Sequence, residues 1–223
     1  MSTTGGRFVA AVLMVGLLGG CAGNSPDPDD PPSETSASSS PEPSSTSPVA
    51  GETNYLPVPD GVELTPQGSD LAVGDSAVVA WEPRQELVGV LDVTVTRLEL
   101  TSFEESFQGW QLDADARKTT PYFVRVTVAN VGESDVGGRD VPLYAVDGSD
   151  NLIQASRFQT KFEPCPGNRV FPETFGPGAT KDVCLVYLMP DRGELTAVSF
   201  RPSQDFDPIT WTGKIKKVDE GLG

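Results

Sequence analysis

The stretch that most constrains the fold runs from residue 120 to 132 and reads TPYFVRVTVANVG. In an extended chain, the side chains of Tyr122, Val124, Val126 and Val128 would share one face, with Phe123, Arg125, Thr127 and Ala129 on the other. An Asn-Val-Gly sequence, typical of a turn, ends the run. The pattern predicts the central strand of an antiparallel β-sandwich and indicates nothing about chemistry.

The first 20 residues have the pattern of an export signal. Arg7 precedes an apolar run from Phe8 to Leu18, and these roughly eleven residues are too few to span a bilayer as a helix. The run ends in Leu18-Gly19-Gly20-Cys21, which resembles the bacterial lipobox. The resemblance implies that the thiol of Cys21 is joined to diacylglycerol and that the protein is exported and anchored to the outer face of the cell membrane. Ordinary cleavage, leaving Cys21 as a free thiol, is the alternative.

Residues 21–52 are rich in Ser, Thr and Pro and poor in large apolar side chains. Such a segment cannot offset the entropy of ordering its chain, so we predict a disordered tether. About 25 proline-rich residues can extend over several tens of ångströms at about 3 Å each. The tether would lift the domain through the cell wall, and its hydroxyl groups could accept O-linked sugars.

Composition limits the functions open to the remaining domain, which we place at residues 53–218. The net charge of −16 should repel nucleic acid and anionic lipid headgroups, and it favours an acidic, soluble extracellular surface over a specific role in binding a cation or a basic partner. Histidine is absent, which excludes Ser-His-Asp and Cys-His catalysis and imidazole metal ligands. We therefore expect a non-enzymatic protein with no catalytic residue, cofactor or metal.

The sequence pattern predicts several further strands. Residues 77–81 begin the first convincing strand, which Pro83 closes, and residues 87–101 form a long one. The apolar residues of the long strand change from odd-numbered positions (91, 93, 95) to even-numbered ones (98, 100), so we expect a bulge near 96–98. We expect residues 53–70 to lie as an arm against the domain. Further strands are expected at 182–189, 198–200 and 209–211, and the polar residues 213–223, including 219–223, are expected to fray.

An Asp-Gly turn predicts a hairpin between residues 146 and 153. Asp147 and Asp150 in this turn, like Asp113 and Asp115 earlier in the chain, offer clustered oxygens of the kind that bind calcium. The spacing does not match an EF-hand, which favours a plain turn.

The segment 102–119 interrupts the β pattern with three aromatic residues, Phe103, Phe107 and Trp110, at spacings that place them on one side of a short helical turn. One interpretation is a loop whose aromatic side chains cover an open end of the sandwich. The other is a lip that binds a partner or ligand, because long loops often carry function. This lip is the candidate binding site.

Cys165 and Cys184 are the cysteines left once Cys21 is lipidated. In an exported protein they are natural disulfide partners, joining a Pro- and Gly-rich loop to the strand 182–189. In that strand, Cys184, Val186 and Leu188 are expected to face the core. A redox or nucleophilic cysteine is the alternative, and it lacks a histidine and a Cys-x-x-Cys motif.

The order of several segments resembles a known family. They are Val73-Gly74-Asp75, Val93-Thr94-Val95-Thr96, the strand 121–126, Ala129-Asn130-Val131-Gly132, Phe175-Gly176-Pro177-Gly178 and Cys184-Leu185-Val186-Tyr187. From Gly74 to Trp211 the chain is similar to an immunoglobulin-like domain family of bacterial lipoproteins that is common in actinobacteria, and its layout is similar to that of a small secreted mycobacterial antigen. The resemblance implies an all-β, immunoglobulin-like sandwich and brings no catalytic residues.

These observations favour a cell-envelope lipoprotein that displays a non-catalytic interaction domain to an envelope protein or wall component. The alternative is a domain that binds a small ligand or divalent cation through acidic loops. A hydrolase is the third class, but no Gly-x-Ser-x-Gly motif supports it.

Overall fold

The computed structural model describes residues 54–167 and 169–218. The predictions for the signal at 1–20, the tether at 21–52, lipidation of Cys21 and the frayed end at 219–223 concern residues outside this part of the chain. Within it, the fold is an all-β sandwich, as the sequence predicts.

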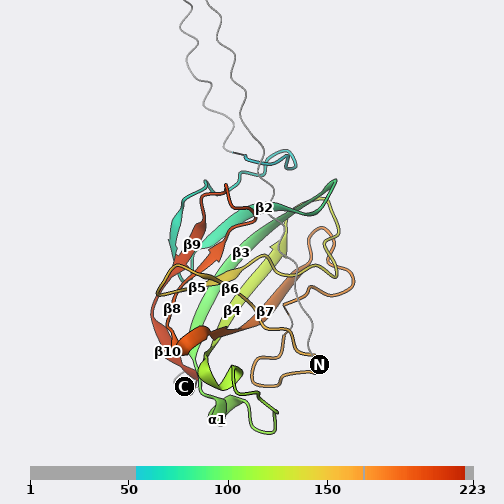
Figure 1. Ribbon diagram of the computed structural model, residues 1–223. Helices are drawn as coiled ribbons and strands as arrows, with labels where there is room; N and C mark the ends of the chain where they lie inside the picture. Colours follow the sequence, from blue (N-terminus) through green and yellow to red (C-terminus); the bar gives the residue numbers. More distant parts are fainter. Residues whose placement is uncertain (1–53, 168, 219–223) are drawn as a thin grey trace, which may run out of the picture. The chain divides into compact units, whose positions relative to one another are not determined.

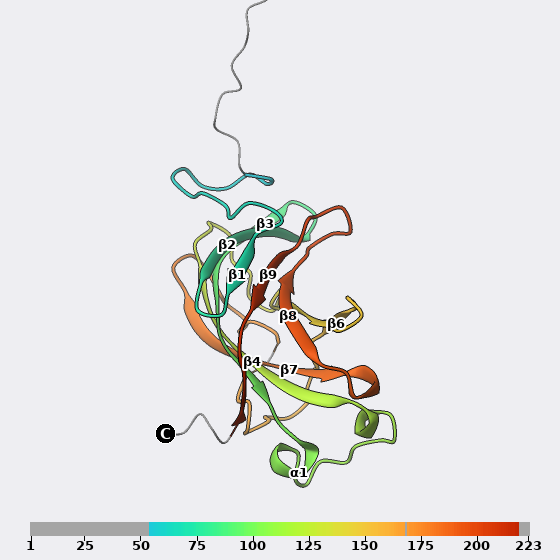
Figure 2. The ribbon, with the colours of Figure 1, turned by 90° about the vertical axis from the view of Figure 1, so that its left-hand side faces the viewer.

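Two five-stranded sheets form the sandwich. Sheet A has the strand order β1-β9-β8-β5-β6, and sheet B has the order β10-β3-β4-β7, with β2 also paired to β3. The pairs β1–β9 and β10–β3 at the sheet edges are parallel, and the other ladders are antiparallel. Both ribbon views show α1 beyond the end of the strands (Figures 1 and 2).

The elements have the following bounds: β1 Asp70–Ala72, β2 Ser76–Arg84, β3 Leu87–Leu100, α1 Phe103–Ser106, β4 Thr120–Asn130, β5 Tyr144–Asp147, β6 Leu152–Gln154, β7 Thr180–Met189, β8 Leu195–Phe200, β9 Ile209–Thr212 and β10 Ile215–Lys217. Short 3₁₀ turns lie at Ala116–Lys118 and Pro190–Arg192.

Strand β4 is central in sheet B, as its sequence predicts. It pairs with β3 on one side and β7 on the other. The β3–β4 register shifts between Val95 and Arg97, which confirms the bulge expected near 96–98. Because of this shift, the apolar side chains of β3 keep facing the interior on both sides of the bulge.

The main core lies between the sheets. Val124, Val126 and Val128 of β4 pack there with Trp211 of β9 and Tyr187 of β7, all buried. The hydroxyl of Tyr187 donates a hydrogen bond of 3.0 Å to the carbonyl of Leu143, just before β5. This bond ties sheet B to sheet A inside the core, and burial of the hydroxyl raises the pKa of Tyr187.

Two sequence predictions are wrong. Cys184, Val186 and Leu188 do not face the main core, because the inner side chains of β7 are Val183, Leu185, Tyr187 and Met189. Both faces of β7 are apolar, so alternation alone could not tell inside from outside. The expected fraying after residue 213 is also wrong for β10, which pairs with β3 from Leu98 to Leu100.

The outer face of sheet B is covered in two places. The arm before β1, predicted from the sequence, lays Tyr55 and the buried Leu64 over β2 and β3. The arm also bonds to the edge of β2, because Thr65 N donates to Val78 O over 2.8 Å and Ala80 N donates to the Tyr55 hydroxyl over 3.0 Å. These bonds occupy backbone groups that an edge strand otherwise leaves open. The second cover is the aromatic cluster described next.

Candidate functional site

The three aromatic residues of the predicted lip belong to a second hydrophobic core on the outer face of sheet B. Phe107 is 3% exposed, and its ring centroid lies 4.7 Å from that of Phe162 and 6.4 Å from that of Phe123 on β4. Phe103 contacts Phe107 at 5.1 Å, and Trp110 contacts Phe162 at 5.5 Å. Phe107 is therefore a packing residue, whereas Phe103 and Trp110 keep part of their surface exposed.

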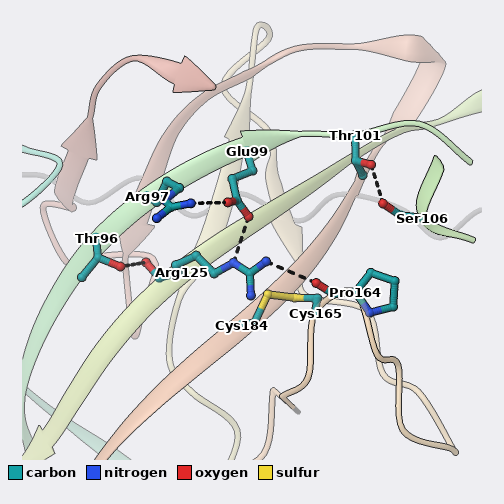
Figure 3. Close-up of polar contacts among 9 residues, drawn as sticks. All are labelled: Thr96, Arg97, Glu99, Thr101, Ser106, Arg125, Pro164, Cys165 and Cys184. Atoms are coloured by element: carbon teal, nitrogen blue, oxygen red, sulfur yellow. Dashed lines mark hydrogen bonds and ion pairs between the residues drawn. A yellow bond between two sulfur atoms is a disulfide. The ribbon is translucent and has the colours of Figure 1, made fainter. Parts of the chain in front are cut away.

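Local sequence explains why the chain folds back here. Ser102 caps α1, and its side chain and that of Glu105 form a capping box with each other's backbone N–H groups. The hydroxyls of Thr101 and Ser106 lie 2.6 Å apart and join the end of β3 to the helix (Figure 3). The arrangement agrees with the interpretation of the segment as a covering loop.

The predicted disulfide between Cys165 and Cys184 is confirmed, with Cα atoms 5.4 Å apart. It joins the loop after Phe162 to β7 and lies in the aromatic cluster. Beside it, Glu99 is 2% exposed and accepts from two arginines, Arg97 at 3.0 Å and Arg125 at 2.8 Å (Figure 3). Arg125 also donates to the carbonyl of Pro164 over 3.2 Å.

This ion cluster satisfies both oxygens of Glu99 and attaches the disulfide loop to the sheet. Each charge has an opposite charge or a carbonyl as its partner, as buried charges require. We therefore interpret the cluster as a structural feature that holds the disulfide loop on the sheet.

The carboxylates of the acidic loops accept hydrogen bonds or form ion pairs within their own loops. Asp147 accepts from Ser149 N and Asn151 N at 2.8 and 2.9 Å and from the Asn151 amide at 2.9 Å. The bonds from Asn151, and then that from Ser149, hold the pKa of Asp147 below its usual value. Asp113 accepts from two backbone N–H groups, and Asp115 forms an ion pair with Lys118 at 2.8 Å.

Asp150 is an exposed residue of the same turn as Asp147. Over residues 54–167 and 169–218, no group of three or more His, Cys, Asp or Glu side chains is placed to hold a metal ion. Over the same residues, no helix has the length and apolarity needed to cross a membrane.

A cavity of about 360 Å³ beside β5 contains a group of charges that the sequence did not point to. Arg139, Arg157 and Arg169 line it with Asp140, Tyr144, Gln154 and Trp81 among others. The backbone brings these residues together, because Asp140 and Val170 form an isolated antiparallel bridge. Bonds from Val141 N to Arg169 O and from Phe171 N to Arg139 O flank that bridge. We call this site the arginine pocket.

The carboxylate of Asp140 organises the pocket. Its two oxygens accept from Arg157 at 3.0 Å and from Arg169 at 2.9 Å. Arg169 also donates to the carbonyl of Ala155 over 2.7 Å. The Nε atoms of Arg139 and Arg169 are buried and have no hydrogen-bond partner among the described residues.

The pocket carries a local charge of +2, because three guanidinium groups face a single carboxylate among its lining residues. Arginine stays protonated at any physiological pH, and its planar group suits carboxylate and phosphate oxygens. A cavity of this size lies within the range of small-molecule sites. Chemically, the pocket can hold an anionic group.

Sequence reasoning missed this site for a physical reason. Arg139, Arg157 and Arg169 all lie in irregular segments between strands, far apart along the chain. The one available signal was the occurrence of arginine in the loops of an acidic chain, and that signal does not say which loops meet. Comparison of the chain with protein-family models, with curated proteins and with solved structures finds no significant match.

Proposed function

We propose that the chain is a non-catalytic binding protein of the cell envelope, whose β-sandwich holds a protein or wall component by an anionic group in the arginine pocket. The export signal and the lipobox-like Cys21 support a lipid anchor on the outer face of the membrane. The resemblance to the immunoglobulin-like family of lipoproteins supports the same location.

The main support for a binding role is that the pocket is positively charged whereas the chain as a whole is strongly acidic. The full sequence has a net charge of −16, yet three of its 16 Lys and Arg residues line one cavity. Burying a guanidinium is costly unless its donors are satisfied, and two of the pocket's Nε donors have no partner among the described residues. An anion in the pocket would offset the cost of burying these guanidinium charges.

Catalysis has less support. Asp140 is the one carboxylate among the lining residues, and both of its oxygens are held in ion pairs, so it is poorly placed to act as a general base. Divalent-cation binding by the acidic loops also has less support, because Asp113 and Asp147 accept hydrogen bonds from their own loops.

Binding can be tested by NMR titration of the purified full chain with galacturonate and with inorganic phosphate, using neutral galactose as the control ligand. Arg157→Gln is the informative variant, because the Arg157 side chain is 59% exposed and the change should leave the fold intact. Arg192→Gln is the matched control, since Arg192 is exposed and outside the pocket.

We expect an anionic probe to bind and galactose to leave the pocket's amide signals in place. Losing one charged hydrogen-bond donor should weaken binding about tenfold or more in Arg157→Gln. Arg192→Gln should bind like the wild type. The proposal is wrong if neither anion binds at millimolar concentration, or if Arg157→Gln binds as well as the control.

The anchor is tested separately by fractionating cells that express the full chain. Replacement of Cys21 by alanine should release the protein from the membrane fraction, because the acyl chains would be lost. Retention of the variant in that fraction would refute lipid anchoring.

A further inference from the structure

The arginine pocket continues into an open groove. A second cavity shares Tyr144 and Pro202 with it, and a third shares Leu152 and Arg201 with the second. The third cavity, of about 420 Å³, lies over β5, β8 and β9. The three cavities therefore adjoin one another and mark a path from the pocket, past Arg201, onto sheet A.

The path follows the outer face of sheet A. Along β8 and β9, the core takes Val198, Phe200, Ile209 and Trp211, so the alternate side chains must point away from it. Strand register aligns five of the outward side chains in one row across the sheet: Gln154, Tyr144, Ser199, Thr210 and Asp70. With neighbouring strands about 4.8 Å apart, four intervals give the row a length of about 19 Å.

The buried side-chain nitrogen and oxygen atoms that lack a hydrogen-bond partner, among the residues described, gather along this path. They are Arg139 Nε, Arg169 Nε, Arg201 Nε and Ser199 Oγ. The first two line the arginine pocket, and the last two line the cavity on sheet A. Buried polar groups normally have partners, so four such atoms along one path make its walls unusually polar, although the atoms themselves are too buried for an occupant to bond directly.

We propose that the occupant is an acidic saccharide chain, with one acidic group in the arginine pocket and the following rings laid across the outer face of sheet A past Arg201. This inference rests on the proposed function of the pocket. It adds the class of ligand and a second contact region, the groove formed by Tyr144, Ser199, Arg201 and Thr210.

Charge and chemistry favour a saccharide. Arg201 lines both outer cavities, which also contain Asp205 and Asp150, and its Nη2 donates to the carbonyl of Gln204 over 2.7 Å. Its other terminal nitrogen can meet a second acidic group. The row offers hydroxyl and amide side chains that match sugar hydroxyls, and it ends at the carboxylate of Asp70, which accepts from the Thr210 hydroxyl over 2.7 Å. The aromatic residues Trp81 and Tyr144 line the pocket end. Sugars present hydroxyls on many sides, so a row of polar side chains suits them.

An acidic peptide fits this face less well. A peptide gains most from adding its backbone to an exposed strand edge. Strand β8, in the middle of the row, is paired on both sides with β5 and β9, so a peptide could add its backbone only at an edge strand, β1 or β6, and not along the row. The face also differs from that of sheet B, where two hydrophobic clusters cover the outer surface.

The test is an NMR titration of the full chain with galacturonate, trigalacturonate and hexagalacturonate, with a poly-L-glutamate of matched charge as the peptide probe. The single sugar should shift amide signals around residues 139–157. The hexamer should shift signals of β8 and β9 as well. Six equivalent rings alone would raise the apparent affinity about sixfold over the single sugar, and we expect the hexamer to bind at least tenfold more tightly than that.

Arg201→Gln should abolish the gain from chain length and leave the affinity for single galacturonate unchanged. Arg192→Gln should retain the full gain, and unchanged melting temperatures would show that both variants are folded. The inference is overturned if affinity does not rise with chain length beyond the number of rings, if Arg201→Gln keeps the gain, or if poly-L-glutamate binds as tightly as the hexamer. In each case binding of galacturonate or inorganic phosphate in the pocket would leave the proposed function standing, whereas failure of both anions to bind would overturn the proposed function and this inference together.

Discussion

Breaking the disulfide between Cys165 and Cys184 should destabilise the domain by a predictable amount. The bond joins residues 19 positions apart and closes a loop of about twenty. In the chain-entropy model, releasing such a loop costs about 3 kcal/mol at 25 °C. For a domain of this size, each kcal/mol lowers the melting temperature by about 2–4 °C, so we expect a fall of about 6–12 °C.

Two perturbations separate the cross-link from packing. Reduction of the wild type removes the bond and leaves both sulfur atoms in the aromatic cluster, where the cysteines are 1% and 5% exposed. The double variant Cys165→Ala/Cys184→Ala also removes the sulfur atoms, so it should be less stable than the reduced wild type. Urea unfolding followed by circular dichroism gives both free energies.

The reasoning would be refuted by a loss of less than about 1 kcal/mol on reduction, once thiol titration has shown that the bond is open. That result would mean that the loop stays folded through its own contacts, chiefly those of Phe162 and the Arg125–Pro164 hydrogen bond. The cross-link would then be redundant.

Three further changes can be measured in the same assay. Tyr187→Phe should lose about 1–2 kcal/mol, because the buried carbonyl of Leu143 loses its donor; no loss would mean that the bond between the sheets is not needed. Glu99→Gln should lose about 1–2 kcal/mol, less than a fully buried pair costs, because the Arg125 side chain is 30% exposed; a gain in stability would contradict this. Asp147→Asn should be less stable than the wild type at pH 7. The lowered pKa of Asp147 gives stability that is present above its unfolded pKa of about 3.9 and is lost as the pH falls through the folded value. The difference in melting temperature should therefore shrink on acidification, and a constant difference from pH 7 to pH 3 would refute this role.

The parts of the fold that follow from local pattern could be predicted. Strand β4 has one apolar face and ends in a turn, so its place in the sheet could be read directly. The parity change in β3 located the bulge, and the Asp-Gly sequence located the β5–β6 hairpin. Each of these features depends on residues close together in the chain.

Features that depend on distant contacts could not be read in this way. Strand β7 is apolar on both faces, so its orientation depended on knowing that a second core covers its outer side. Strand β10 looks polar and terminal, and it forms a strand because β3 is long enough to pair with it beyond β2. The arginine pocket depends on the backbone bridge between Asp140 and Val170, whose partners are 30 positions apart.

The central claim is that the arginine pocket selects for negative charge, and one comparison of ligands tests it most directly. Galacturonate and its methyl ester share the same ring and differ in the charge of one carboxyl group. Titrating the full chain with each gives two dissociation constants under identical conditions. We predict that the acid binds at least tenfold more tightly to the wild type, and that this preference largely disappears in Arg157→Gln. Equal affinity of the wild type for the acid and the ester would contradict the account.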